Sequence, residues 1–359
     1  MTPNFQTIDA AGALAGKRIF TAIDLNVPIV GGKVADDYRI VRAKPTLDFL
    51  SARGARTLLV SHQTHASDSL FPVYECLKQD YPLIFADTVA VARAALEKAV
   101  HGSFVLLENV RRFAGEEAND AVFARELASL TAVYVNEAFS ASHRAHASIV
   151  GVPKHLPHYA GFLFAEEVVR LSHAFTPTTP SLVILGGAKF ETKLPLVAKF
   201  LSTADTVYVC GALANDFFRT RGEEVGESLV SRVPMSGTVV NHPHLVLPAD
   251  VVWKGQKIVD AGARAVAELL ALIAGARFVL WNGPMGQYEY GYGETTAEVA
   301  RALSASSAET IVGGGDTLAA ISRLGLLEKF SFVSTGGGAM LQFLANETLP
   351  GLEALTARP

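Results

Sequence analysis

Short apolar runs alternate along the chain with segments whose apolar residues recur at helical spacing. Five such runs lie in the first half, at residues 18–24, 56–62, 81–87, 103–109 and 131–137. Continuous apolar runs of this length are typical of parallel strands that are buried on both faces. The segments between them, such as 36–54 and 119–130, have the spacing of amphipathic helices, and Gly54 is placed to end the first of these.

A second series of apolar runs follows the Thr- and Pro-rich connector at residues 176–181. Its members are residues 181–187, 206–211, 244–250, 277–283, 309–316 and 330–338. The pattern predicts an α/β protein with two doubly wound, parallel-sheet (Rossmann-like) domains, joined by a helical segment around residues 159–174.

Composition narrows the class of protein further. The chain has 359 residues, of which 50% are hydrophobic and 18% are charged, with a formal net charge of −4. This length suits about two domains, and the absence of a basic excess argues against nucleic acid as a partner. The most apolar window, 265–281, is interrupted by Glu268 and Arg277, which argues against a membrane span. Cys76 and Cys210 lie far apart in apolar surroundings and are expected to be reduced thiols of a cytoplasmic protein.

Polar and glycine-rich segments follow the expected strands, where parallel sheets bind ligands. In the first half these segments carry Arg111, Arg144 and several histidines, and Arg39 lies beside them. Their convergence would form an anion pocket. In the second half the corresponding segments are rich in glycine, which lets a backbone approach a ligand closely. This asymmetry indicates a small anion on the first domain and a nucleotide on the second.

Two glycine segments of the second half, 184–193 and 311–321, each join a strand to a helix. Amides at the start of a helix bind phosphate, and Asp316 offers a hard oxygen ligand for Mg²⁺. The alternative for both segments is a tight strand-to-helix turn, with Asp316 or Thr317 as the residue that caps the helix. Neither the P-loop pattern nor the dinucleotide pattern GxGxxG is present.

The histidine pairs His62/His65 and His143/His146 raise the question of a metal site. Zinc needs three or four ligands in a fixed geometry, and the sequence shows no third ligand near either pair. Hydrogen-bonded imidazoles are therefore the preferred interpretation.

Eight segments in order resemble the motifs of the phosphoglycerate kinase family. They are "GKRIFTAIDLNVP", "DDYRIVRAKPTL", "LLENVRRF", "VYVNEAFSASHRAHASIVGV", "LGGAKFETK", "LWNGPMGQYE", "IVGGGDT" and "STGGGAMLQFL". The resemblance covers the chain from about Gly16 to Leu355, and the collinear order makes it specific.

The resemblance implies reversible phosphoryl transfer between 1,3-bisphosphoglycerate and MgADP by a monomeric enzyme with Mg²⁺ and ATP or ADP. It implies an acid-binding domain at 1–165, a nucleotide-binding domain at 166–340, a hinge that closes the two, and a tail at 341–359 that packs back on the first domain. Neither nucleic acid nor a membrane is expected as a partner.

The resemblance also assigns site residues, motif by motif. The acid substrate would be bound by Asp24, Asn26, Arg39, His62, His65, Arg111 and Arg144. The nucleotide would be bound by Gly186, Gly187, Ala188, Lys193, Gly211, Asn282, Pro284, Glu289, Gly313, Gly314, Gly315, Asp316 and Thr317, with Asp316 on the Mg²⁺ of the nucleotide complex. The transferring group would be stabilised by Arg39, Lys189, Lys193, Gly314 and Gly315.

The chain departs from the family pattern in the acid pocket, where Ala22 and His65 replace two arginines. A mostly neutral imidazole lacks the guanidinium fork. Losing two charge-assisted hydrogen bonds costs ~3–6 kcal/mol, or roughly 10²–10⁴ in affinity. Arg42 and Arg112 are candidates to restore positive charge.

Other departures lie around the nucleotide and in one loop of the acid side. Thr192 replaces an aspartate, and Gln287 with Tyr288 replaces an apolar pair, while Ser140 opens an altered loop before His143. Three hypotheses follow: a phosphoglycerate kinase with a rearranged pocket, a kinase of another small carboxylate or acyl phosphate, and a non-catalytic nucleotide-binding relative.

Overall fold

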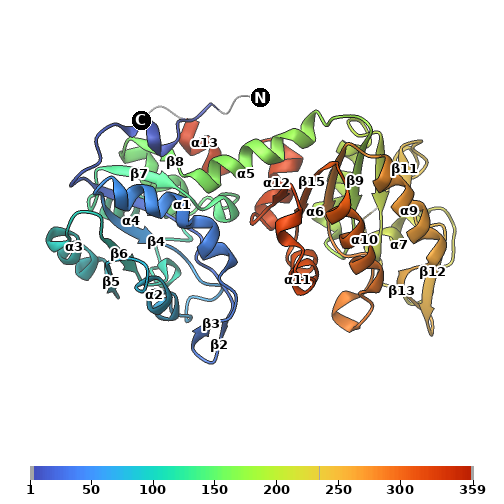
Figure 1. The fold of residues 1–359 in the computed structure, drawn as a ribbon, viewed down its shortest axis with the longest axis horizontal. Coiled ribbons are helices and arrows are strands. Elements are labelled where there is room, and N and C mark those ends of the chain that lie inside the picture. The colour runs from blue at the N-terminus through green and yellow to red at the C-terminus, as the bar shows by residue number, and fades with distance from the viewer. Residues whose placement is uncertain (1–3, 234, 357–359) are drawn as a thin grey trace. The chain divides into compact units, whose positions relative to one another are not determined.

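The computed structural model describes residues 4–233 and 235–356, which form two compact units (Figure 1). Of the described residues, 4–169 and 348–356 belong to the first unit, and 170–233 and 235–347 belong to the second. The boundary falls inside helix α5 (Phe162–Ser172). Residues 341–347 belong to the second unit, whereas helix α13 (Pro350–Thr356) contacts strand β8 of the first. Residues 357–359 of the expected tail lie outside the described residues.

The first unit is built on a six-stranded sheet of order β5-β6-β4-β1-β7-β8, parallel throughout. Its strands are β1 (Arg18–Ala22), β4 (Arg56–Val60), β5 (Leu83–Ala86), β6 (Phe104–Leu107), β7 (Val133–Asn136) and β8 (His158–Ala160). Every residue of β6 and β7 is buried, as their continuous apolar pattern predicts. A small antiparallel ribbon is formed by β2 (Ile29–Val30) and β3 (Lys33–Val34).

Helices connect the strands of the first unit. The longer ones are α1 (Tyr38–Ala52), α2 (Phe71–Leu77), α3 (Val89–Lys98) and α4 (Ala121–Ala128). Short helical turns are η1 (Ile8–Ala11), η2 (Val110–Arg112), η3 (Phe139–Ala141), η4 (Ala147–Gly151) and η5 (Val152–His155). Helix α3 packs against β4, β5 and β6. Helix α1 ends as expected, because Gly54 follows it in the left-handed region with φ +68°.

The second unit repeats the architecture with a parallel sheet of order β11-β10-β9-β14-β15-β16. Its strands are β9 (Ser181–Leu185), β10 (Thr206–Val209), β11 (Leu245–Val246), β14 (Phe278–Asn282), β15 (Glu309–Gly313) and β16 (Phe332–Val333). The central strands β9 and β14 are buried along their whole length. A separate antiparallel hairpin is formed by β12 (Val251–Lys254) and β13 (Lys257–Ala261).

Helices of the second unit alternate with its strands. They are α6 (Phe190–Phe200), α7 (Gly211–Thr220), α8 (Gly237–Val240), α9 (Ala263–Gly275), α10 (Glu294–Ala305), α11 (Gly315–Arg323) and α12 (Gly338–Asn346), with short turns η6 (His173–Phe175), η7 (Tyr288–Tyr290) and η8 (Leu327–Lys329). Two six-stranded parallel sheets with connecting helices confirm the predicted fold class.

Each sheet has one point where successive connections leave in opposite directions. In the first unit β1 leads to β4 on one side, whereas β7 leads to β8 on the other. In the second unit β9 leads to β10, whereas β14 leads to β15 on the opposite side. Ligands of open α/β sheets bind outside the carboxyl ends of the strands at such switch points. The loops after β1 and β7, and those after β9 and β14, are therefore where each unit is expected to bind its ligand.

Candidate functional site

The switch point of the first unit holds a hydrogen-bonded cluster around Asp24. Arg39 Nη1, on helix α1, lies 2.6 Å from Asp24 Oδ2 and also donates to the Asn26 carbonyl oxygen at 3.2 Å. The Asn26 amide donates to Asp24 Oδ1 at 2.9 Å, and the Ser140 hydroxyl, from the loop after β7, donates to Asp24 Oδ2. The structure thus brings together three of the residues assigned to the acid substrate, with Asp24 holding Arg39 in place.

Charge balance in this cluster follows from burial and pairing. Burial opposes ionisation of Asp24, but the positive charge of Arg39, that of His62 where its imidazole is protonated, and the hydrogen bonds from Ser140 and Asn26 together lower the pKa of Asp24 below the ordinary value. Burial lowers the pKa of His62, and nearby Arg144 and Arg39 lower it further, against the opposing effect of Asp24. His62 is therefore a neutral hydrogen-bonding group at pH 7, and the cationic charge here belongs to the arginines.

A small cavity of about 10 Å³ lies at the same strand ends, with room for about one water molecule. Ala22, His62, Arg111 and Arg144 line it, and Ala22 is level with the ends of the neighbouring strands β4 and β7. Arg144 is half-buried, and its side chain makes no hydrogen bond or ion pair with any other residue in the described ranges. A guanidinium in this state is available to an anionic ligand.

His65 does not join this cluster. Its side chain is exposed and does not line the cavity, while its amide donates to Asp68 Oδ2 at 3.1 Å. Arg111 connects the segment to the cavity, because its Nη1 donates to the carbonyl oxygens of Gln63 at 3.0 Å and Thr64 at 2.8 Å. The two histidines of "SHQTH" thus have different surroundings.

Neither candidate for replacing the missing arginines is positioned at the cavity. Arg42 donates to Glu166 Oε2 at 2.8 Å. Arg112 lies 3.0 Å from Glu108 Oε2 and donates to the carbonyl oxygens of Ala66 and Ser67. Both guanidinium groups are therefore engaged by the protein itself.

Glu116 is a cavity residue that the sequence reasoning missed. Its carboxylate accepts hydrogen bonds from the Ser148 amide at 3.0 Å and the Ser148 hydroxyl at 2.6 Å, and His146 Nδ1 lies 3.9 Å away. Burial raises the pKa of Glu116 to about 7, although both Ser148 hydrogen bonds act in the opposite direction. The only hint in the sequence was an acidic pair, Glu116–Glu117, just after the cationic segment at 108–112.

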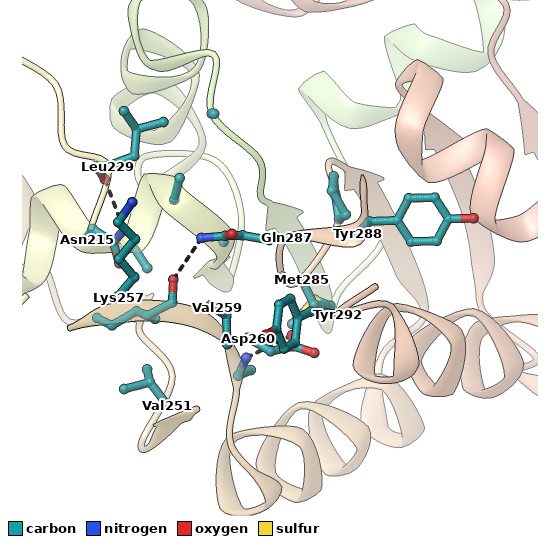
Figure 2. Close-up of a pocket in the computed structure, with 18 of the residues that line it drawn as sticks. Asn215, Leu229, Val251, Lys257, Val259, Asp260, Met285, Gln287, Tyr288 and Tyr292 are labelled. Carbon is teal, nitrogen blue, oxygen red and sulfur yellow. Dashed lines mark hydrogen bonds between the residues drawn. The ribbon is translucent and has the colours of Figure 1, made fainter. Parts of the chain in front are cut away.

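The second unit contains a cavity of about 740 Å³ beside its switch point (Figure 2). This volume suits a nucleotide-sized ligand. Six of the residues assigned to the nucleotide line it: Gly187, Ala188, Gly211, Pro284, Glu289 and Asp316. The loops after β9, β10 and β14 and the first turn of α11 therefore meet at one cavity.

Lys193 lies beneath the glycine loop rather than on the cavity wall. It is only 4% exposed, and its Nζ donates to the Gly186 carbonyl oxygen and, at 3.4 Å, to the Asn282 carbonyl oxygen. Burial lowers the pKa of Lys193 to about 8. Lys189, one turn earlier at the N-cap of α6, is exposed. Of these two lysines, Lys189 is therefore a surface residue and Lys193 is a buried one.

The remaining residues assigned to the nucleotide do not line the cavity and belong to the strand ends, loops and helix start next to it. Gly186 cannot carry a side chain, since a Cβ there would lie 2.3 Å from the Pro284 carbonyl oxygen. The Thr317 hydroxyl accepts a hydrogen bond from the Gly283 amide at 2.9 Å, which ties α11 to the loop after β14. Asn282 is buried at the end of β14, level with Gly313 at the end of β15. Gly314 and Gly315 follow and open helix α11.

Several cavity residues of the second unit were not singled out from the sequence. They are Asn215, Lys257, Asp260 and Tyr292, together with Gln287 and Tyr288, which the sequence marks only as departures from the family. Lys257 and Asp260 belong to the β12–β13 hairpin, whose place beside α7 is set by contacts between distant parts of the chain.

No group of three or more His, Cys, Asp or Glu side chains within residues 4–233 and 235–356 is arranged to hold a metal ion. The residues present do fit a metal carried by a nucleotide, because the Asp316 carboxylate is exposed in the first turn of α11 and lines the cavity. Mg²⁺ in such sites commonly takes one or two protein carboxylates along with phosphate oxygens and water.

Comparison with known proteins identifies the family. A family model described as phosphoglycerate kinase matches residues 8–347. The chain belongs to the phosphoglycerate kinase family. A phosphoglycerate kinase of Methylobacterium radiotolerans is 38% identical over 99% of both chains, and one of Moorella thermoacetica is 38% identical over 96% of this chain and 98% of its own.

Solved structures agree with this assignment. The phosphoglycerate kinase of Coxiella burnetii superposes with a TM-score of 0.83 at 32% identity, and that of Pyrococcus horikoshii OT3 with a TM-score of 0.84 at 28% identity; each comparison covers 98% of both chains. The resemblance found from the motifs is confirmed. Like the phosphoglycerate kinase family as a whole, the chain is a phosphotransferase with a carboxyl group as acceptor.

Within the described part of the chain, no helix is long and apolar enough to cross a membrane.

Proposed function

We propose that this chain transfers a phosphoryl group reversibly between 1,3-bisphosphoglycerate and MgADP, giving 3-phosphoglycerate and MgATP. The bond from phosphorus to the acyl oxygen breaks, a bond to a terminal oxygen of ADP forms, and a carboxylate is released. The observation that carries the proposal is the buried Lys193 ammonium under the glycine loop of a nucleotide-sized cavity that Asp316 also lines.

In this proposal the first unit binds the acid. Arg39, Arg111 and Arg144 supply positive charge, and neutral His62 supplies a hydrogen bond. Asp24 acts on Arg39, which it holds by the 2.6 Å ion pair. His65 contributes little to binding of the acid, because it lies outside the cavity.

The second unit binds the nucleotide in this proposal. The backbone of the loops after β9, β10 and β14 approaches the phosphates, and Glu289 reaches the sugar. The residues concerned are Gly186, Gly187, Ala188, Gly211, Asn282, Pro284, Gly313 and Thr317.

The chemistry needs positioning and charge neutralisation more than covalent help. Lys193, Lys189 and the amides of Gly314 and Gly315 provide positive charge or donors for the transferring group. A general base is not needed, because a carboxylate nucleophile is already ionised at neutral pH. Mg²⁺ bound with the nucleotide neutralises phosphate charge, and Asp316 is the residue that would hold it.

A second candidate is phosphoryl transfer to another small carboxylate that lacks the distal phosphate. The observation in its favour is the small cavity beside Ala22, with room for about one water, together with the remote position of His65. The third hypothesis, a non-catalytic relative, is set aside because the chain belongs to a phosphotransferase family and keeps Lys193 and Asp316.

The proposal places the protein in the cytoplasm as a monomer that acts on small molecules in glycolysis or gluconeogenesis. Its support is the family assignment, the modest net charge of −4 and two free cysteines, one of them buried.

The test is ATP- and Mg²⁺-dependent phosphorylation of 3-phosphoglycerate, measured by coupling to NADH oxidation, with glycerate as the competing acid. Arg144→Met should raise the KM for the acid by about 10–100-fold while MgADP affinity stays unchanged, because one charge-assisted contact is lost. Arg53→Met, which removes an exposed arginine at the end of α1, is the matched control and should change neither.

Turnover of 3-phosphoglycerate with this response to Arg144→Met would support the main proposal. Turnover of glycerate alone would select the second candidate. Tight MgADP binding without turnover of either acid would refute both.

A further inference from the structure

A buried carboxyl group, that of Glu116, belongs to the same cavity wall as the arginines that are proposed to bind the acid. Glu116 is 1% exposed and lines the small cavity of the first unit together with Arg111 and Arg144. Among the described residues its one ion-pair contact is with His146 Nδ1, at 3.9 Å. An ionised carboxylate that no lysine or arginine pairs with would oppose the binding of an anion here, because like charges repel strongly in buried surroundings.

Glu116 also holds the segment that carries Arg144. Its backbone carbonyl oxygen accepts a hydrogen bond from the Ala147 amide at 2.9 Å, and its carboxyl group accepts from the Ser148 amide at 3.0 Å and the Ser148 hydroxyl at 2.6 Å. The hydroxyl contact suits both charge states, because a hydroxyl can donate to a carboxylate or accept from a protonated carboxyl group. Glu116 can therefore change its charge and keep its hold on this segment.

The histidines near Glu116 are neutral at pH 7. The titratable and charged groups around this carboxyl group are His62, Arg111, Glu117, Tyr134, Arg144 and His146. Burial lowers the pKa of both His62 and His146, and Arg144 lowers each of them further. Burial also lowers the pKa of His143, which lies on the same loop. An acid that binds beside these imidazoles therefore meets no positive charge from them.

The other groups around Glu116 have settled charges as well. Burial raises the pKa of Tyr134, on β7, so this phenol stays protonated. Glu117 is exposed and lies 3.2 Å from Arg111 Nε, which compensates its charge. Helix α4, which packs against η4, has its charged side chains exposed. Glu116, whose pKa burial raises to about 7, is thus the group of this cluster that changes charge near neutral pH.

We propose that binding of the acid substrate is coupled to uptake of a proton by Glu116, so that this carboxyl group is neutral in the complex. The proton comes from the solvent, joins a carboxylate oxygen of Glu116, and leaves again when the acid is released. The inference rests on the proposed function, since it assumes that the acid binds at Arg111 and Arg144. The coupling is electrostatic and reciprocal: the bound anion favours the protonated carboxyl group, and protonation tightens binding of the anion by the same factor.

The test is calorimetric titration of the full chain with 3-phosphoglycerate at pH 7.5, once in HEPES and once in Tris. These buffers differ in ionisation enthalpy, so the difference in observed heat gives the number of protons taken up per acid bound. If the bound anion lowers the acidity constant of Glu116 about tenfold, the wild-type protein should take up about half a proton. Its dissociation constant for the acid should rise about fivefold between pH 7 and pH 9.

Glu116→Gln keeps an acceptor for Ser148 and cannot take up a proton. It should bind the acid with about half a proton less uptake than the wild-type protein, and its affinity should not change between pH 7 and pH 9. Glu126→Gln, which removes an exposed carboxyl group of helix α4, is the matched control and should keep the wild-type uptake. Protons exchanged by the phosphate of the acid itself are the same in all three proteins and cancel in the comparison.

Proton uptake distinguishes titration of Glu116 from a structural role, because a loosened Arg144 segment would weaken acid binding equally at pH 7 and pH 9. Equal uptake by the wild-type and Glu116→Gln proteins would assign the proton to another group, which would overturn the inference and leave the proposed function intact. Where Glu116→Gln fails to fold, a wild-type dissociation constant that stays constant between pH 7 and pH 9 would overturn the inference in the same way. Absence of acid binding by the wild-type protein would overturn the proposed function itself.

Discussion

Lys193 is a buried ammonium whose removal should make the protein more stable and inactive. Burial lowers its pKa from 10.5 to about 8, so the folded state holds the charged form less favourably than the unfolded chain does. A difference of this size corresponds to about 3 kcal/mol against folding at pH 7. The charge is therefore retained at a cost to stability, which agrees with the proposed role of Lys193 in phosphoryl transfer.

Lys193→Met removes the charge and keeps most of the side-chain volume. Removing the buried charge stabilises the folded state, but the Gly186 carbonyl oxygen then loses the Lys193 ammonium as its donor. That loss costs ~1–2 kcal/mol of stability. The Asn282 carbonyl oxygen still accepts from the Gly186 amide at 2.9 Å. The net expectation is a rise of ~1–2 kcal/mol in the free energy of unfolding at pH 7, together with loss of phosphoryl transfer.

Urea unfolding followed by tryptophan fluorescence measures this change, because both tryptophans, Trp253 and Trp281, belong to the second unit. The wild-type free energy of unfolding should rise between pH 8 and 10.5, where the unfolded chain still binds the proton that the folded state has released. That rise should be absent in Lys193→Met. Lys189→Met, which alters an exposed lysine of the same segment, should stay within ~0.5 kcal/mol of wild type. A less stable Lys193→Met protein with the wild-type pH dependence would refute the reasoning.

Three further predictions concern the first unit. Ala22→Arg should lower the free energy of unfolding by ~1–3 kcal/mol, measured by circular dichroism in urea, because the adjacent cavity has room for about one water; unchanged stability would contradict this. His65→Arg should leave both stability and 3-phosphoglycerate affinity unchanged in calorimetry, because residue 65 is exposed and lies outside the cavity; tighter binding would contradict this. As pH rises from 4.5 to 7, the free energy of unfolding of the wild-type protein should fall by about 3 kcal/mol, because a carboxyl with a raised folded-state pKa favours folding only while it is protonated. Glu116→Gln should remove this pH dependence. An identical pH dependence in both proteins would show that Glu116 ionises normally.

Local patterns were enough to predict the architecture. Continuous apolar runs such as 181–187 and 277–283 do become central parallel strands, because a strand buried on both faces needs apolar residues at every position. Helix ends at glycines could also be predicted from the sequence, since a residue such as Gly54 ends a helix through its own backbone conformation. The order of the eight motifs then identified the family, which the comparisons confirm.

Which individual side chains are buried, and what they contact, could not be predicted from local sequence patterns. Lys189 and Lys193 share one segment, yet one is exposed and the other is buried against Asn282, 89 residues away. His62 lines a cavity that His65, three residues later, does not.

The sequence by itself therefore determined the two parallel sheets, the polar and glycine-rich loops at the ends of their strands, and the family. Only the tertiary structure decided which charges are buried, as for Glu116, and which polar atoms lack a partner, as for Asn215 Oδ1. The physical reason is that secondary structure follows from local periodicity, whereas burial and pairing depend on neighbours that the fold brings from distant parts of the chain.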